Sequence, residues 1–176
     1  GAAERRSISG RHRHSIYCIL PPHILRAIAI NGTAPERTAA LDTLSTAQTF
    51  RAMRADGRLA PPAPKRAGVL AVEGEKQRTI YSAQNQQNLP GVIVRAEGAP
   101  PTGDVAADEA YDGLGATFDF YWDTFQRNSI DDQGLPLEGS VHFGTNYDNA
   151  FWNGERMVFG DGDGKLFNRF TISLDV

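Results

Sequence analysis

The spacing of hydrophobic residues changes along the chain, from three or four near the N-terminus to two further on. After Pro22, three apolar residues fall on one helical face (Ile24, Leu25 and Ile28), and Gly32 follows as a stop. Proline suits the first turn of a helix because it has no N–H group to leave unpaired. The pattern predicts a helix over residues 22–30.

A second helix is expected directly after the first. Thr33 and Glu36 have the spacing of a capping box, in which each side chain bonds the backbone N–H of the other residue. Apolar residues then recur at every third position, at Leu41, Leu44, Ala47 and Phe50. The Pro-rich residues 60–64 have the composition of a linker. We therefore expect a helical segment over residues 1–60 and a linker over residues 61–66.

Beyond the linker, apolar and polar residues alternate, which is typical of strands. Val- and Ile-rich stretches predict antiparallel strands at residues 68–72, 79–83 and 91–95. Further short strands are predicted at residues 140–143, 151–152 and 157–159. The last two flank Asn153-Gly154, a dipeptide that favours hairpin turns.

One long helix interrupts the strands. Asp104 is a suitable N-cap because its carboxylate can accept hydrogen bonds from the free N–H groups of a first turn. Apolar residues follow at spacings of three and four, at Ala110, Leu114, Phe118, Tyr121 and Phe125. Gly113 and Gly115 weaken the helix by about 1 kcal/mol each. The whole pattern predicts an α+β fold, with a helical N-terminal segment followed by a β-rich domain.

Composition narrows the class of protein. No stretch reaches the roughly 18 consecutive apolar residues of a membrane span, so we expect no membrane partner. The chain starts without Met and without the apolar core of a signal peptide, which leaves its location open between secreted and cytoplasmic. With one cysteine, Cys18, it can form neither an internal disulfide nor a Cys-x-x-Cys metal site.

Charge is distributed unevenly. Residues 1–66 carry 11 Lys and Arg against 4 Asp and Glu, whereas the remainder carries 7 against 17. Segments of opposite sign attract each other, which supports a boundary near residues 57–67. A basic arm also suits nucleic acid, but this one has few aromatic residues to stack on bases and the acidic remainder would repel phosphate. We expect no nucleic-acid partner.

The aromatic segment 147–154 is the clearest candidate for a functional site. One interpretation is an edge strand whose Phe151 and Trp152 fill the core. The other is a peptide groove, in which the strand edge pairs with a substrate and Asn149 offers a donor and an acceptor to its amides.

Metal-binding patterns are weak. The run Gly160-Asp-Gly-Asp-Gly164 lacks the glutamate that completes a calcium loop, so we expect tight turns there. No two histidines have the i, i+4 spacing of a zinc helix. His142 stands alone in its segment, and we expect it to be structural.

Several runs together resemble the N-terminal domain of the thermolysin family of metallopeptidases. They are Ser140-Val-His-Phe-Gly144, Tyr147 through Gly154, Met157 through Gly164, and Asp175-Val176. Upstream, Pro21-Pro22-His23-Ile24-Leu25 followed by Asn31-Gly32 resembles the short propeptide of the protealysin-type branch. On this resemblance, residues 1–60 are a propeptide, 61–66 a linker, and 67–176 an incomplete N-terminal domain that is β-rich with one long helix.

The resemblance implies the precursor of a neutral metalloendopeptidase that uses zinc and calcium and cleaves before large hydrophobic residues. In the family, Asp-Val is followed by His-Glu-x-x-His, whose imidazoles bind zinc and whose glutamate is the general base. This motif is absent from the chain, so we assign no catalytic residue and expect the chain alone to be inactive. We also expect that the sequence is truncated before the motif.

The resemblance further implies roles for single residues. Asn149 and Ala150 match edge-strand residues that bind the substrate backbone, and Phe151 and Trp152 lie beside them. The hydrophobic pocket for the residue after the cleaved bond is matched by Phe167, Phe170 and Val176. Asp175 matches a calcium ligand whose partner carboxylates lie beyond the chain.

The expected partners are peptide or protein substrates, and the propeptide itself as an intramolecular inhibitor. Two interpretations stay open for Cys18, either a small buried hydrophobe or a thiolate that occupies the open position on the zinc ion. The alternative for the whole chain is a non-catalytic binding or inhibitory module derived from this family.

Overall fold

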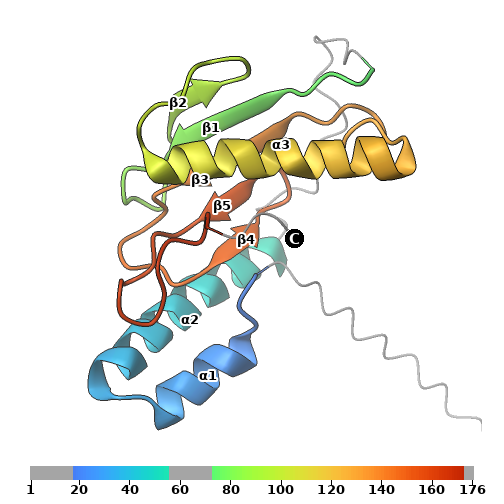
Figure 1. The fold of residues 1–176 in the computed structure, drawn as a ribbon. Coiled ribbons are helices and arrows are strands. Elements are labelled where there is room, and N and C mark those ends of the chain that lie inside the picture. Colours follow the sequence, from blue (N-terminus) through green and yellow to red (C-terminus); the bar gives the residue numbers. More distant parts are fainter. Residues whose placement is uncertain (1–17, 56–72, 173–176) are drawn as a thin grey trace, which may run out of the picture.

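The computed structural model describes residues 18–55 and 73–172, which form three helices and one five-stranded sheet (Figure 1). The helices are α1 (Pro22–Asn31), α2 (Ala34–Ala55) and α3 (Val105–Phe125). The strands are β1 (Arg78–Ser82), β2 (Val92–Ala96), β3 (Leu137–Val141), β4 (Ala150–Trp152) and β5 (Met157–Phe159). The predicted α+β fold is therefore confirmed.

The first two helices begin as the sequence indicates. Pro22 lies in the first turn of α1. Ahead of α2, the backbone N–H of Thr33 donates to the Glu36 carboxylate at 2.6 Å, which is one half of the expected capping box. The two helices share a small core of Leu25, Ala40 and Leu44. Each helix thus covers the apolar face of the other.

Helix α3 begins at the predicted cap. The Asp104 carboxylate accepts hydrogen bonds from the N–H groups of Ala106 and Ala107 at 3.0 and 3.4 Å. Gly115 lies within this helix for a steric reason, because a Cβ atom there would come within 2.5 Å of Nη1 of Arg78. The loss of helix propensity at Gly115 is offset by room for that guanidinium.

The sheet is mixed, with strand order β2-β1-β3-β5-β4. Strands β1 and β2 pair antiparallel as predicted, and β4 and β5 form the predicted hairpin. After α3 the chain returns as β3, which is parallel to β1 and to β5. The hairpin loop is held by Asn153, whose Oδ1 accepts from the N–H groups of Glu155 and Arg156, both at 2.9 Å.

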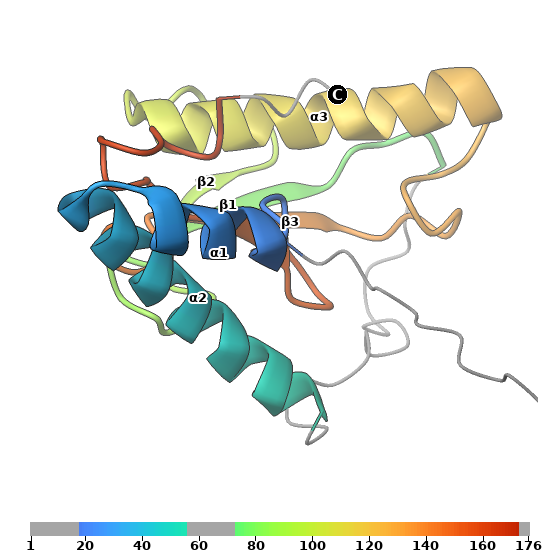
Figure 2. The same ribbon diagram turned by 90° about the horizontal axis from the view of Figure 1, so that it is seen from below.

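Two apolar clusters lie on opposite faces of the sheet. Alternate residues divide between them: Ala150 and Phe159 pack towards α3, whereas Phe151 and Val158 pack with Phe50 of α2. Figure 2 shows α3 on one side of the sheet and α2 on the other. The helical pair α1–α2 is thus attached to the sheet through the second cluster, next to β4.

Strands β1, β2 and β4 differ from the prediction by one residue at their ends, and β3 differs by more. The strand expected at residues 140–143 is β3, Leu137–Val141, and it ends where His142 adopts a left-handed backbone with φ of 54°. The predicted strand at 68–72 and the linker at 61–66 lie outside the described residues.

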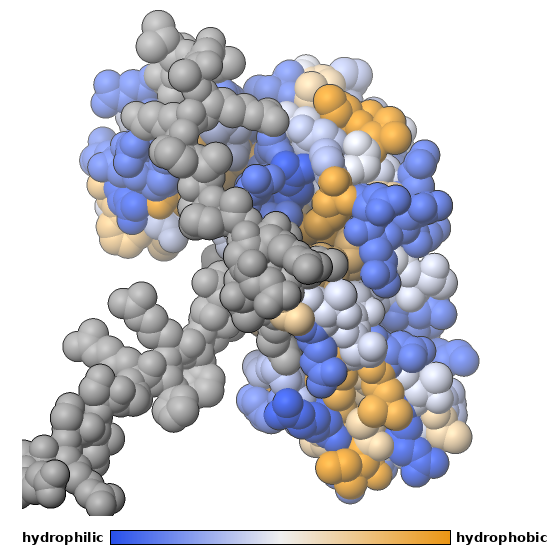
Figure 3. All heavy atoms as spheres, turned by 180° about the vertical axis from the view of Figure 1, so that it is seen from behind, coloured by the Kyte–Doolittle hydropathy of each residue, from blue (hydrophilic) through white to orange (hydrophobic). Residues whose placement is uncertain are grey.

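Exposed apolar side chains are scattered. In the rear view of Figure 3, hydrophobic residues reach the surface in separate patches, one of them over the lower part where α1 and α2 lie. Exposed apolar residues of these helices include Ile24, Ile30 and Leu41. Within the described ranges, no helix has the length and apolar character needed to cross a membrane.

Candidate functional site

The outer edge of β4 pairs with residues near the N-terminus, just ahead of α1. Cys18 forms an antiparallel bridge with Phe151, and the N–H of Ile19 donates to the carbonyl of Ala150 at 2.9 Å. The segment 18–20 therefore lies along the outer edge of β4, and Leu20 is 129 residues away from Asn149 in the sequence.

Asn149 fixes this added strand from the side. Its Oδ1 accepts the N–H of Leu20 at 2.9 Å, and its Nδ2 donates to the carbonyl of the same residue at 3.1 Å. Oδ1 also accepts the N–H of Ala150 at 2.9 Å, which orients the amide. One carboxamide thus binds both backbone groups of a single residue.

The residues of this edge are packed into the core of the protein. Asn149, Ala150 and Phe151 are buried, and Trp152 is half-buried. Phe151 contacts the rings of Phe50 and Phe143, at centroid distances of 4.7 and 5.6 Å. Phe151 fills a core, as the first interpretation expects, and the backbone beside it pairs with residues 18–20. That the same edge binds a substrate stays a prediction.

The loop after β5 returns to the same end of the hairpin. The N–H of Gly160 donates to the carbonyl of Asn149 and the N–H of Phe170 donates to the carbonyl of Gly160, both at 3.0 Å. Phe167 and Phe170 are half-buried with ring centroids 5.6 Å apart. A Cβ on Gly160 would come within 2.0 Å of the Tyr147 carbonyl oxygen, so only glycine permits this close approach. The expected tight turns are present, with Gly162 and Gly164 at positive φ.

His142 ties this loop to α3. Its Nδ1 lies 2.8 Å from Asp161 and its Nε2 lies 2.7 Å from Asp104, the cap of α3. Hydrogen bonding to Asp161, outweighing partial burial, raises the pKa of His142 to about 9. At neutral pH His142 is therefore a cation held between two carboxylates, which agrees with a structural role.

The remaining predicted residues fall in two groups. The Cys18 side chain packs against the cluster of Phe143, Phe151 and Val158. Asp175 and Val176 lie outside the described residues. The part of the chain that the structure describes holds no group of three or more His, Cys, Asp or Glu side chains that could bind a metal ion.

Sequence reasoning did not single out Leu20, Thr43 or Asp148. Leu20 is the residue bound by Asn149, and Thr43 accepts a hydrogen bond from the backbone of Asp148. The available signal was the short apolar stretch 16–20 directly before Pro21-Pro22. An apolar stretch that cannot continue into a helix is a candidate for an added strand.

Comparisons with known proteins identify the family. The sequence profile of the thermolysin metallopeptidase catalytic domain matches residues 39–176. The chain is 52% identical over 161 residues to an extracellular metalloprotease of Pectobacterium carotovorum subsp. carotovorum, a match that covers 92% of this chain and 44% of that protein. It is 44% identical over 158 residues to Protease PrtS of Photorhabdus sp. (strain Az29), covering 90% and 42%. The chain belongs to the thermolysin family of metallopeptidases.

One solved structure matches most of this chain. The precursor of protealysin, a metalloproteinase from Serratia proteamaculans, matches with a TM-score of 0.73 and 49% identity, over 90% of this chain and 42% of that one. By contrast, the match to bacillolysin of Bacillus cereus covers 54% of this chain. The chain is thus a precursor region of a thermolysin-family metallopeptidase similar to the protealysin precursor. It spans less than half the length of the first two relatives, at 44% and 42%.

Proposed function

We propose that the chain is the propeptide and N-terminal domain of a zinc-dependent neutral metalloendopeptidase, and that residues 18–55 inhibit this enzyme by filling its substrate groove. The supporting observation is the pairing of Ile19 and Leu20 with Ala150 and Asn149. Peptide substrates commonly bind by adding a strand to an exposed sheet edge. A covalently attached segment has a high effective concentration, so it occupies the edge ahead of substrate until it is cut.

In this proposal, a substrate takes the place of the segment 18–20. The Ala150 carbonyl and Asn149 Oδ1 accept two of its N–H groups, and Asn149 Nδ2 donates to a carbonyl. Phe167 and Phe170, together with Val176, border a pocket for a large hydrophobic residue after the cleaved bond. The extended backbone is thereby held in one register, which reduces the entropy lost on reaction.

Zinc and calcium enter the proposal through the family. When bound, the zinc ion supplies a Lewis acid and an activated water. The described residues contain no ligand set for either ion, so we place neither here and derive no step through them. Asp175 as a calcium ligand and Cys18 as an inhibitory zinc ligand stay predictions.

The contacts between residues 18–55 and 73–172 include backbone pairing, apolar packing and hydrogen bonds of the side chains of Asn149 and Thr43. Among residues 18–50 and 73–172, no ion pair joins the N-terminal helices to the sheet domain.

The reading frame after Val176 tests this function. A continuation that encodes His-Glu-x-x-His, and a purified extended precursor with one bound zinc and zinc-dependent casein hydrolysis after processing, would support the endopeptidase. The 176-residue chain should show neither zinc nor activity. A stop codon at this position would instead favour a non-catalytic inhibitory module.

A further inference from the structure

A carboxyl group is buried where α2 meets the sheet domain. Asp148 directly precedes Asn149 and is 0% exposed. Its Oδ1 accepts the N–H of Asp163 at 2.8 Å, whereas Oδ2 is buried without a hydrogen-bond partner. A carboxylate anion is costly to bury in this way, because part of its charge is left without a donor.

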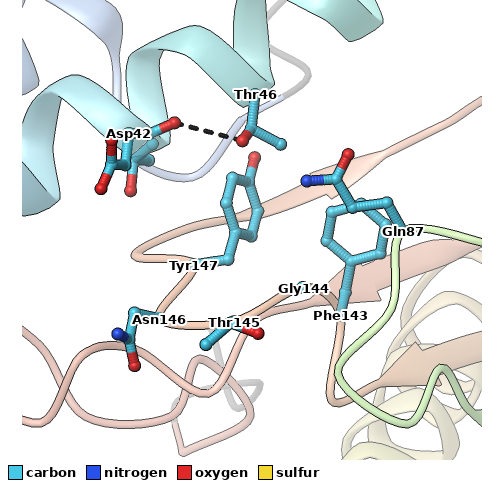
Figure 4. Close-up of a pocket in the computed structure, with 9 residues that line it drawn as sticks. Asp42, Thr46, Gln87, Phe143, Gly144, Thr145, Asn146 and Tyr147 are labelled. Atoms are coloured by element: carbon cyan, nitrogen blue, oxygen red, sulfur yellow. Dashed lines mark hydrogen bonds between the residues drawn. The ribbon is translucent and has the colours of Figure 1, made fainter.

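Helix α2 is what covers this group. The Thr43 hydroxyl accepts the backbone N–H of Asp148 at 3.2 Å, and Thr43 is itself 1% exposed. Beside this contact, α2 and the loop 143–147 enclose a cavity of about 30 Å³, into which Tyr147 points from the loop towards Thr46 (Figure 4). Docking of α2 therefore removes the surroundings of Asp148 from bulk water.

The charged groups near Asp148 do not stabilise its ionised form. Among the described residues, no base forms an ion pair with Asp148. Asp163, on the facing loop, adds a like charge, and Lys165 acts on Asp163. The acids on the facing helix are Glu36, on which the charge of Asp163 acts, and the exposed Asp42, which lines the adjacent cavity. Burial is the main cause that raises the pKa of Asp148 to about 6. The backbone N–H of Asp163 opposes this rise, whereas the Asp163 carboxyl group adds to it.

We propose that Asp148 is a proton-controlled latch for the α1–α2 cover: the neutral acid holds the cover on the sheet domain, and ionisation of the acid loosens it. This inference rests on the proposed function, in which the cover is inhibitory. It adds a trigger, because a precursor that is held shut in acid becomes easier to open near neutral pH.

The direction follows from proton linkage. When α2 lifts, water reaches Asp148 and its pKa returns to about 3.9, the ordinary value for aspartate. A group with a higher pKa in the docked state favours docking at pH below the open-state value, and this contribution is lost as the pH rises through the docked-state value. Between pH 4 and 7, the opening equilibrium constant of the cover should rise on the order of a hundred-fold.

Hydrogen–deuterium exchange on the chain of Figure 1 tests the latch. Protection factors for the amides of α2 are measured from pH 4 to 8, corrected for intrinsic exchange and referred to the amides of α3 in the same sample. In the unaltered chain, protection of α2 should fall through pH 6 while α3 stays constant. In Asp148→Asn, which keeps the shape and cannot ionise, protection of α2 should stay high at every pH.

Two further variants make the result specific. Asp163→Asn removes the like charge that raises the pKa of Asp148 and should move the fall in protection to lower pH, whereas Asp42→Asn on the exposed side of α2 should leave it unchanged. Equal pH dependence in the unaltered chain and in Asp148→Asn overturns the latch and leaves the inhibitory cover intact. Absence of α2 protection at every pH, in both chains, overturns the docked cover and the latch with it.

Discussion

The Asn149 carboxamide makes two hydrogen bonds with the backbone of Leu20: Oδ1 accepts its N–H at 2.9 Å, and Nδ2 donates to its carbonyl at 3.1 Å. The same carboxamide is the group that the family resemblance assigns to substrate. In the proposed function, inhibition and substrate binding compete for one set of hydrogen bonds, and a change that weakens one should weaken the other.

Replacement of Asn149 by Ala in the full-length enzyme should lower kcat/KM by about tenfold or more. The variant loses two hydrogen bonds to an extended peptide, each contributing about 0.5–1.5 kcal/mol. Steady-state kinetics with a peptide substrate would measure this loss. Asn153→Ala is the matched control, since the Asn153 side chain accepts its hydrogen bonds from Glu155 and Arg156 in the hairpin loop. Unchanged kcat/KM in Asn149→Ala would contradict the groove assignment.

Phe50 should be the main apolar anchor of the cover. Its ring lies 4.7 Å from that of Phe151 and 5.5 Å from that of Phe143, across the junction between α2 and the sheet. Truncation of a buried Phe to Ala costs about 3–5 kcal/mol, so Phe50→Ala should expose α2 and make the full-length precursor active earlier. Leu41→Ala, on the exposed side of the same helix, should behave like the unaltered precursor. Equal activation times for all three would show that the ring does not anchor the cover.

Stability should depend on His142 at alkaline pH. Its pKa is raised to about 9 in the folded protein, so its contribution is fully present below about pH 6.5, the ordinary histidine pKa, and is lost as the pH rises through 9. We expect urea unfolding to show a loss of about 2 kcal/mol between pH 6.5 and 10, since each pKa unit corresponds to about 1.36 kcal/mol and partial exposure reduces the effect. His142→Gln should lack this dependence, and His23→Gln on exposed α1 should retain it. The same pH dependence of the free energy of unfolding in all three proteins would show that His142 is not its source.

Local sequence rules predicted most of the elements because their signals lie within a few residues. The Asp104 cap, the Thr33–Glu36 spacing and the hairpin dipeptide all act through backbone groups at most three residues away. The parallel pairing of β1 with β3 was not predicted, since it depends on where α3 returns the chain.

The sequence indicated the strand edge of the candidate site but not the segment that pairs with it. Family resemblance identified Asn149 and Ala150, but the segment that occupies them comes from the other end of the sequence, 129 residues away from Asn149 in the case of Leu20. Asp148 carried no signal in the sequence, because its burial depends on Thr43 of α2. Contacts of this kind join segments whose local patterns are independent of each other.

Salt should weaken inhibition by residues 1–60 more than inhibition by residues 18–55. Residues 1–66 carry 11 basic against 4 acidic side chains, whereas residues 18–55 carry four arginines against two acids. Charges in solution are screened within roughly 10 Å at 0.1 M salt. We expect inhibition of the mature enzyme by a synthetic 1–60 segment to weaken with salt, and inhibition by an 18–55 segment to change little. Salt-independent inhibition by both segments would reject electrostatic docking.

The most direct test of the account is competition at the β4 edge. A synthetic 1–60 segment and its analogue with an N-methyl group on Leu20 are assayed against the full-length enzyme from which residues 1–60 have been removed. N-methylation deletes the N–H that Asn149 accepts, while an Ile19→Ala segment keeps this N–H and trims an exposed side chain. The account predicts competitive inhibition by the unmodified and Ile19→Ala segments, and inhibition about tenfold weaker by the N-methyl analogue. Equal potency of all three segments, or inhibition that does not compete with substrate, would contradict it.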